Sequence, residues 1–324
     1  MAWSVPVHRP VMRAEVLAVL SPAPSALLLD GTVGTGGHAE AWLEASAPGG
    51  RVIGLDRDPS ALEIARGLLG RFGDRLVLVH ADYRAAGAEL DRLGAPPPDA
   101  VLLDLGLGTH QVDDPERGFA FRHEAPLDMR FDRSRPAPTA AEILARAPEP
   151  ELQRILTEYG EEPAARKLAR AIVDARRRAP ITTTFELAEL VRRVAPARGR
   201  HRIDPATLVF QALRIAVNDE LTGLGQALHE LALRLRPGGR LAVIAYHSLE
   251  DRVAKHTLRR LSEPCRCRRG DPCTCGAIGA LELVERRAAR PSPEEIAENP
   301  RARSARLRWA VRPETTATGG GRNR

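Results

Sequence analysis

Short apolar runs alternate with amphipathic segments through the first hundred residues of the chain. The apolar runs cover residues 26–29, 51–55, 76–79 and 100–103. Nearly continuous apolar runs of this length are typical of strands that are buried on both faces, as the strands of parallel sheets are. Residues 39–43 and 59–69, which lie between the runs, have the spacing of amphipathic helices. The pattern predicts an α/β domain with a mostly parallel sheet covered on both faces.

The alternation of apolar runs and amphipathic segments ends after residue 111. Residues 113–205 contain no segment with the pattern of a strand, and ten prolines interrupt this region. Helices are predicted around residues 140–144, 149–159, 163–177 and 185–194. Thr183 and Glu186 have the spacing of a capping box at the start of the last helix. We interpret this region as a helical domain inserted into the α/β domain.

The α/β pattern resumes at residue 206 with a long predicted helix to residue 235. A strand over residues 240–246 and a helix from His247 follow. Residues 281–285 and 305–311 are predicted to pair as an antiparallel hairpin. The Gly- and Thr-rich residues 315–324 are expected to be disordered. The predicted organisation is therefore a discontinuous α/β domain of residues 1–112 and 206–314, a helical domain of residues 113–205 and a disordered tail of residues 315–324.

A glycine-rich turn follows the first apolar run. Asp30 ends the run, and the turn continues as Gly31-Thr-Val-Gly-Thr-Gly36-Gly37-His38. Glycine permits positive φ angles and a close approach to a ligand, and the start of the next helix offers unpaired N–H groups. Asp56 ends the second apolar run, at the distance where doubly wound folds hold the ribose hydroxyls of a ligand. The combination favours a nucleotide-like ligand over the alternative that the glycines only make a tight bend.

The spacing of this turn differs from the dinucleotide-binding pattern, and an acid directly precedes it. The turn resembles the first motif of class I methyltransferases, which use S-adenosylmethionine (SAM). Ligands of parallel sheets bind outside the carboxyl ends of the strands. We therefore expect Asp30, Asp56, Tyr83 and Asp104, which each follow or end a predicted strand, to converge on one crevice.

Positive charge is concentrated in two parts of the chain. The formal net charge is +6 and the isoelectric point about 9.6, but residues 252–324 alone contain 17 Lys and Arg against 8 Asp and Glu. Residues 176–202 contain eight Arg against two Glu. Localised positive charge favours RNA or DNA as a partner, whereas the alternative is a solvated, arginine-rich surface. The sequence shows no signal peptide and no transmembrane run, which predicts a soluble, cytoplasmic protein with no membrane partner.

All four cysteines lie close together, at Cys265, Cys267, Cys273 and Cys275. In a cytoplasmic protein, such a cluster favours metal binding over disulfides. Two Cys-x-Cys pairs can supply four thiolates to a tetrahedral structural zinc, although a two-residue gap is more common in such sites. Zinc and free thiols on a surface loop are the two alternatives.

Ten short motifs, taken in order along the chain, resemble one family. They are residues 30–32 (DGT), 36–38 (GGH), 55–59 (LDRDP), 102–106 (LLDLG), 113–119 (DDPERGF), 126–130 (PLDMR), 159–162 (YGEE), 210–214 (FQALR), 247–251 (HSLED) and 298–304 (ENPRARS). The chain thereby resembles, from residue 8 to about residue 311, the bacterial methyltransferases that modify N4 of a cytosine in the decoding centre of 16S ribosomal RNA (rRNA). The resemblance implies a class I SAM-dependent, Rossmann-like fold with an inserted helical domain. It also implies 16S rRNA within the small ribosomal subunit as the partner.

The resemblance also implies which residues bind the cofactor. The family's SAM contacts fall on Gly36, Gly37, His38, Asp56, Tyr83, Asp104 and Gln111. The chain departs from the family in the loop before Gln111, where it has Leu107-Gly-Thr-His110 in place of valine, two serines and a proline. Because that loop would border both cofactor and acceptor, the departure bears on how the cytosine is placed.

Two residues are candidates for the acceptor chemistry. The N4 lone pair of cytosine is delocalised into the ring, so an enzyme must align the amine, accept a hydrogen bond from it and receive a proton. Asp104 is the nearest carboxylate, with contact to the cofactor alone as the alternative. His247, after the fifth strand, is the second candidate, with a structural role as the cap of the next helix as the alternative. Phe119, Phe121 or Tyr246 would stack on a flipped base.

The insertion and the basic C-terminal region are expected to hold the ribosomal subunit. Asp128 and Arg130 are interpreted as a link between the insertion and the crevice, and Arg301, Arg303 and Arg306 as RNA contacts. Two other functions remain open at this point. One is a SAM-dependent methyltransferase with a shifted acceptor, and the other is an RNA-binding protein that holds SAM as a structural ligand.

Overall fold

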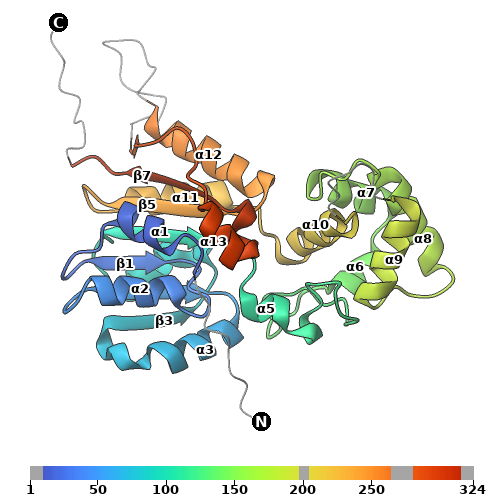
Figure 1. The fold of residues 1–324 in the computed structure, drawn as a ribbon, viewed down its shortest axis with the longest axis horizontal. Helices are drawn as coiled ribbons and strands as arrows, with labels where there is room; N and C mark the ends of the chain where they lie inside the picture. The colour runs from blue at the N-terminus through green and yellow to red at the C-terminus, as the bar shows by residue number, and fades with distance from the viewer. Residues whose placement is uncertain (1–9, 197–203, 264–279, 315–324) are drawn as a thin grey trace, which may run out of the picture. The chain divides into compact units, whose positions relative to one another are not determined.

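The computed structural model describes residues 10–196, 204–263 and 280–314 (Figure 1). The chain divides into two compact units. The α/β unit combines the residues up to Gly106 with those from Gly223 onward, and the helical unit is Leu107–Thr222. Among the described helices, none combines the length and the apolar character that crossing a bilayer requires.

The α/β unit is built on a seven-stranded sheet with the order β3-β2-β1-β4-β5-β7-β6. The strands are β1 (Leu27–Asp30), β2 (Arg51–Asp56), β3 (Leu76–His80), β4 (Ala100–Asp104), β5 (Arg240–Ala245), β6 (Glu282–Leu283) and β7 (Arg306–Val311). The first five are parallel, and β7 is antiparallel to both of its neighbours, β5 and β6. The predicted fold class, a Rossmann-like α/β fold with a mostly parallel sheet, is confirmed, and β6 and β7 form the predicted hairpin.

Helices cover both faces of this sheet. Alternate residues of a strand point to opposite faces, and accordingly Leu28 belongs to one apolar cluster whereas Leu27 and Leu29 belong to another. The Leu28 cluster includes residues of α1 (Arg13–Leu20), α2 (Gly37–Ala45) and α3 (Pro59–Leu69). The opposite cluster includes residues of α4 (Ala86–Arg92), α11 (Leu224–Arg234) and α12 (Ser248–Ser262). Burial on both faces is the reason why the strands are continuous apolar runs in the sequence.

The strand order places a switch point between β1 and β4. The chain runs outward from β1 to β2 and β3, then returns to β4 on the other side of β1. Crevices at such switch points, outside the carboxyl ends of the strands, hold the ligands of open α/β sheets. The shorter elements of the unit are η1 (Gly70–Arg75), η2 (Tyr83–Ala85), α13 (Pro293–Glu298) and η4 (Pro300–Ser304).

The helical unit has its own apolar core. Its elements are α5 (Thr109–Asp113), η3 (Pro115–Arg117), α6 (Ala140–Arg146), α7 (Glu149–Glu158), α8 (Ala165–Arg176), α9 (Thr184–Val194) and α10 (Ala206–Asn218). The predicted capping box is present at α9, where the Thr183 side chain accepts a hydrogen bond from the Glu186 N–H at 3.3 Å. All residues of the core cluster lie between Phe119 and Val217.

The long helix predicted over residues 206–235 is wrong. The structure has two helices there, because Asp219 takes a left-handed conformation (φ 51°) that ends α10. Val209, Phe210 and Leu213 of α10 are buried in the core of the helical unit. The boundary between the units therefore falls after Thr222 rather than before residue 206, and it falls after Gly106 on the other side. The periodicity of the sequence predicted helical structure here, but it did not show that α10 packs into the core of the helical unit.

Candidate functional site

The glycine-rich turn connects β1 to α2 and depends on close packing. Gly36, which precedes α2, has a φ of 98°, and a Cβ atom there would lie 2.5 Å from Cδ1 of Leu69. A side chain at this position would therefore be strained and would also collide with α3. The turn crosses the carboxyl end of the sheet, since Gly31 N–H donates to the Leu102 carbonyl of β4 at 2.9 Å.

Asp56, at the end of β2, holds the turn from the other side. One carboxylate oxygen accepts a hydrogen bond from the Gly34 N–H at 2.8 Å, and the other accepts one from the Asp58 N–H at 2.8 Å. Each carboxylate oxygen has a second lone pair that can accept from a hydroxyl group. Asp56 therefore combines a structural role in the turn with the capacity to bind a diol.

Thr32 joins the turn to the end of β4. Its hydroxyl oxygen accepts a hydrogen bond from the Asp104 N–H at 2.6 Å, and its own N–H donates to the Asp30 carboxylate at 3.1 Å. Asp30 is fully buried. Burial raises the pKa of Asp30 to about 7. The charge of His38 and the hydrogen bond from the Thr32 N–H lower this pKa, whereas the like charges of Asp104 and Asp56 raise it further. The three predicted carboxylates thus lie near enough to one another to interact electrostatically.

Asp104 contacts the buried His38 and the half-buried Tyr246. The Tyr246 hydroxyl donates to one Asp104 oxygen at 2.9 Å, and His38 Nε2 lies 3.5 Å from the other oxygen. Burial, followed by the negative charge of Asp104, raises the pKa of Tyr246 well above its usual value, so the hydroxyl stays protonated and keeps donating. The Asp104 side chain remains 21% exposed, whereas that of His38 is 7% exposed. Asp104 is therefore oriented from within and accessible from the crevice.

Both ring nitrogens of His38 lack a hydrogen-bond partner within the described part of the chain. Buried polar atoms without partners are rare in folded proteins and are frequent at functional sites. His38 occupies the first turn of α2, where it follows the two glycines of the turn. The imidazole thus offers an unused donor or acceptor beside the Asp104 carboxylate.

His247 acts as the cap of α12. Its Nδ1 accepts a hydrogen bond from the Glu250 N–H at 3.4 Å, and its Nε2 lies 3.1 Å from a Glu250 carboxylate oxygen. The His247 side chain is 8% exposed. The capping role that was the alternative at the sequence level is thus present in the structure. Asp104 is the more accessible of the two candidates for acceptor chemistry.

Tyr83 and Gln111 occupy different units. Tyr83 opens η2 in the α/β unit, and its Cβ would be 3.1 Å from a Cβ added at Gly31, so the two residues lie side by side. Gln111 is buried in α5 of the helical unit, where its side-chain oxygen accepts a hydrogen bond from the Gly108 N–H at 3.0 Å. The Gln111 side chain thus stabilises the first turn of that short helix.

The departures from the family in the preceding loop are coupled. A Cβ atom at Gly108 would lie 2.5 Å from Cε1 of His110. The backbone of Gly108 is extended (φ −69°, ψ 149°), which any residue adopts, so the glycine is required by the neighbouring ring rather than by its own conformation. The histidine and the glycine therefore fit each other.

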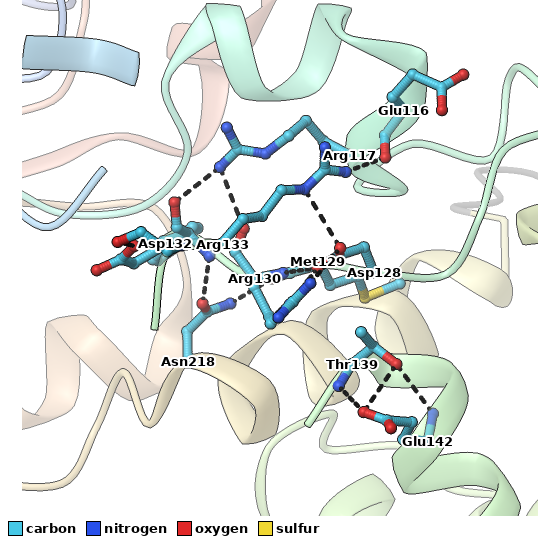
Figure 2. Close-up of polar contacts among 12 residues, drawn as sticks. Glu116, Arg117, Asp128, Met129, Arg130, Asp132, Arg133, Thr139, Glu142 and Asn218 are labelled. Atoms are coloured by element: carbon cyan, nitrogen blue, oxygen red, sulfur yellow. Dashed lines mark hydrogen bonds and ion pairs between the residues drawn. The ribbon is translucent and has the colours of Figure 1, made fainter. Parts of the chain in front are cut away.

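Asp128 and Arg130 belong to a polar network inside the helical unit (Figure 2). The guanidinium of Arg130 binds both carboxylate oxygens of Asp128, at 2.8 and 2.9 Å. Met129, between them, is buried and has a φ of 61°, and the Asn218 amide holds this strained segment by donating to the Met129 carbonyl at 2.7 Å and accepting from the Phe131 N–H at 2.7 Å. These contacts fix the segment to α10. The side chains of Asp128 and Arg130 thus have their partners within the helical unit.

The basic C-terminal candidates divide into two kinds. Arg301 and Arg303 lie exposed in η4. Arg306 instead binds the buried Asp251 carboxylate at 2.8 Å, together with Arg308 at 2.6 Å. Asp251 keeps a low pKa, because the two guanidinium groups outweigh its burial. The four cysteines lie outside the described residues.

Sequence reasoning missed the roles of Thr32 and of the Tyr246 hydroxyl. Thr32 follows the acid of the turn, but its bond to the end of β4 depends on sheet order, which no local pattern encodes. Tyr246 was considered only as a stacking ring, although its position one residue after β5 places it at the same sheet edge as Asp104. The carboxyl-end rule, applied to all five parallel strands, would have found it.

Comparison with known proteins gives a family. A model described as the MraW methylase family matches residues 6–313. Three similar proteins are each named ribosomal RNA small subunit methyltransferase H. The protein from Geobacter sulfurreducens is 49% identical over 94% of this chain and 98% of its own length. The one from Symbiobacterium thermophilum is 47% identical over 94% and 96%, and the one from Thermomicrobium roseum is 49% identical over 94% and 93%.

Proposed function

The chain belongs to the MraW methylase family of SAM-dependent methyltransferases, and from this membership we propose that it methylates N4 of a cytosine in the decoding centre of 16S rRNA. The proposed partner is the small ribosomal subunit, and the proposed location is the cytoplasm. The observation that carries the chemistry is the accessible Asp104 carboxylate, oriented by Tyr246 beside the glycine-rich turn.

The residues at the crevice suit SAM by their charge and by their hydrogen-bond acceptors. SAM carries a positive sulfonium and a ribose diol, and Asp56 and Asp104 place carboxylates at the ends of β2 and β4. Asp56 can accept from the diol while it keeps its two backbone N–H bonds, and Gly36 and Gly37 let the backbone come close. Tyr83, His38 and Gln111 complete the set of cofactor contacts that we propose. When bound, SAM supplies an activated methyl group.

We assign the handling of the acceptor proton to Asp104. A methylated cytosine amine must lose one proton, and a carboxylate within hydrogen-bond reach can take it. The Tyr246 hydroxyl occupies one Asp104 oxygen, which fixes the orientation of the carboxylate and leaves the lone pairs of the other oxygen for N4–H. His38 Nε2 lies 3.5 Å from that oxygen.

His247 is the second candidate for the proton. Its Nδ1 is engaged at the start of α12, and its Nε2, the nitrogen proposed to exchange a proton, lies 3.1 Å from a Glu250 carboxylate oxygen. Replacement by asparagine keeps an acceptor for the helix cap. His247→Asn should therefore retain the fold, and a loss of turnover in this variant would assign a chemical role in addition to the cap.

Metal content tests the remaining proposal at the cysteines. Four thiolates from Cys265, Cys267, Cys273 and Cys275 would bind one structural zinc. Elemental analysis of the purified chain should then give one zinc per chain, and Cys265→Ser with Cys273→Ser should abolish it. An absence of zinc from the unmodified chain would assign four free thiols instead.

Methyl transfer from labelled SAM to unmodified small subunits, followed by mapping of the modified nucleotide, tests the proposed function. We expect label on N4 of a decoding-centre cytosine. Asp104→Asn should lose turnover by a factor of about 100 or more, since general-base catalysis typically contributes 10²–10⁴-fold. Label on another nucleotide would identify a methyltransferase with a shifted acceptor. SAM binding without any transfer would identify an RNA-binding protein that holds SAM as a structural ligand.

A further inference from the structure

A polar groove lies between two neighbouring helices of the α/β unit. Helices α11 and α12 lie side by side (Figure 1), and both contribute leucines to one buried cluster. A Cβ atom added at Gly225 would be 3.2 Å from the Thr257 hydroxyl, so the helices approach closely there. Above this contact lies a cavity of about 830 Å³, lined by Gly225, Gln226, His229, His256, Thr257, Arg259, Arg260 and Glu263.

The described lining of the groove carries more basic side chains than carboxylates. Among the described residues of its lining, Glu263 is the single acid, and it pairs with Arg259 at 3.4 Å in an exposed salt bridge, which is a weak interaction. Within the described part of the chain, the side chains of His229, His256 and Arg260 have no hydrogen-bond or ion-pair partner. An anion that entered the groove would therefore displace no partner of Arg260 among the described residues.

Basic side chains continue from the groove along the exposed side of α12. Arg252, Lys255, His256, Arg259 and Arg260 are all exposed, and they recur at the spacing of one helix face. The two acids of the helix, Glu250 and Asp251, are buried in its first turn. Arg252 and Arg259 are two turns apart, about 10 Å along the axis.

Stabilisation of the helix dipole does not account for this stripe. Basic residues in the last turn of a helix interact favourably with its C-terminal end, but this effect fades within one turn. Arg259 and Arg260 lie in that last turn, whereas Arg252 and Lys255 lie in the first half of α12. A ligand with several anionic groups in a row accounts for the whole stripe.

We propose that the α11/α12 groove and the exposed face of α12 bind the phosphate backbone of the RNA substrate. The inference rests on the proposed function for the choice of RNA as the polyanion. Arg and Lys along one face match successive phosphates, and Gln226 adds a neutral donor at the rim. The exposed face of α12 presents no large apolar side chain, as insertion into a lipid surface would require.

Salt dependence of RNA binding measures the number of phosphate contacts. Binding of the full chain to unmodified small subunits should weaken linearly as the logarithm of affinity against the logarithm of salt concentration. In Lys255→Ala with Arg260→Ala, the slope should fall by about two, that is about one for each lost contact. SAM affinity and the melting temperature should stay at their unsubstituted values, because neither side chain is buried.

Arg66 provides a matched control. It lies exposed in the last turn of α3, in the same unit, and like Arg260 it has no side-chain partner among the described residues. Its exposed neighbours on the helix, Ser60, Glu63 and Leu68, give it no basic stripe. Arg66→Ala should therefore leave both affinity and slope unchanged.

Three results would overturn the proposal: an unchanged slope in the double variant, an equal fall in Arg66→Ala, or no RNA binding by the unsubstituted chain. Loss of binding to anionic phospholipid vesicles with RNA binding intact would also overturn it, in favour of a membrane surface. The failure of the proposed function is a separate result. If the unsubstituted chain transfers no methyl group but the double variant still lowers the salt slope by about two, the groove binds RNA and the proposed methyltransferase function is wrong.

Discussion

The Asp56 side chain has two roles in the structure, so its substitution has two effects. Its two carboxylate oxygens accept N–H bonds from Gly34 and Asp58, so Asp56→Ala removes a support of the turn as well as a diol acceptor. We expect SAM affinity to fall by about 1–3 kcal/mol, as for the loss of a charged acceptor. Calorimetry on the folded variant measures this change.

Asp56→Asn removes only part of what Asp56→Ala removes. The amide retains one acceptor oxygen for one of the two N–H groups, but it loses the charge. Its SAM affinity should lie between that of Asp56→Ala and that of the unsubstituted chain. Unchanged affinity in the alanine variant would remove Asp56 from the cofactor site and leave it as a structural residue of the turn.

Asp30 should make stability depend on pH. Its pKa rises from 3.8 to about 7 on folding, because burial disfavours the carboxylate. The folded state then binds the proton more tightly than the unfolded state, so the free energy of unfolding decreases as pH rises between these two values. Above about pH 7 the full penalty is present. In Asp30→Asn, the neutral amide keeps the acceptor for the Thr32 N–H and removes the penalty.

Urea denaturation of both chains at several pH values isolates this contribution. The difference in free energy of unfolding, variant minus unsubstituted, should grow in the variant's favour from about pH 4 to about pH 7, by up to about 1.4 kcal/mol per pH unit. Parallel curves would mean that Asp30 is ionised in the folded protein throughout this range.

At the scale of elements, the loop before α5 provides a test of coupled substitutions. Gly108→Ser alone places a Cβ atom 2.5 Å from the His110 ring, so the ring must move, at a cost of about 1 kcal/mol in stability. Gly108→Ser with Thr109→Ser and His110→Pro removes that ring and restores the family's residues at positions 108–110. We expect the triple variant to recover the lost stability, which thermal denaturation measures.

The same triple variant tests what the loop does in the reaction. We expect turnover on small subunits to change more than SAM affinity, because the loop is proposed to position the acceptor. A tenfold shift in SAM affinity, about 1.4 kcal/mol, with constant turnover per bound cofactor would assign the loop to the cofactor instead. No change in either quantity would make the loop neutral.

Elements were predictable where a local pattern determines them. The five parallel strands follow from apolar runs such as residues 26–29, and the α9 cap follows from Thr183 and Glu186. The break at Asp219 was not predictable from periodicity, since apolar residues continue at helical spacing on both sides of it. Within the site, the residues that end strands were found. The Tyr246–Asp104 bond was missed, because it depends on β4 and β5 being neighbours in the sheet.

At the scale of the whole molecule, the two units should differ in what each needs in order to fold. The core of the helical unit lies entirely between residues 119 and 217, so a fragment of residues 107–222 should be helical and should unfold cooperatively. A fragment of residues 113–205, the boundary predicted from the sequence, lacks α10 and its buried Val209, Phe210 and Leu213.

Loss of α10 should prevent the shorter fragment from folding. Burial of each large apolar side chain contributes about 1.5–3 kcal/mol, and the total stability of a small domain is about 5–15 kcal/mol. Circular dichroism during thermal denaturation of both fragments compares the two boundaries. A cooperative transition in the shorter fragment would show that α10 is dispensable to that core.

The late position of β5 in the chain has a consequence for the order of events during synthesis. Strand β4 ends at Asp104, but its neighbour β5 begins only at Arg240, after the whole helical unit. At about 5–20 residues per second, the ribosome needs on the order of ten seconds to make that intervening stretch. Through this interval the nascent chain carries a half-sheet with an open, apolar edge, which is a template for wrong pairing. The helical unit can fold during this interval from its own residues. The sheet of β1 to β4 is completed only after β5 has been synthesised. Slower growth at low temperature, or chaperones that shield the β4 edge, should therefore improve the yield of folded protein more than changes anywhere in the helical insertion.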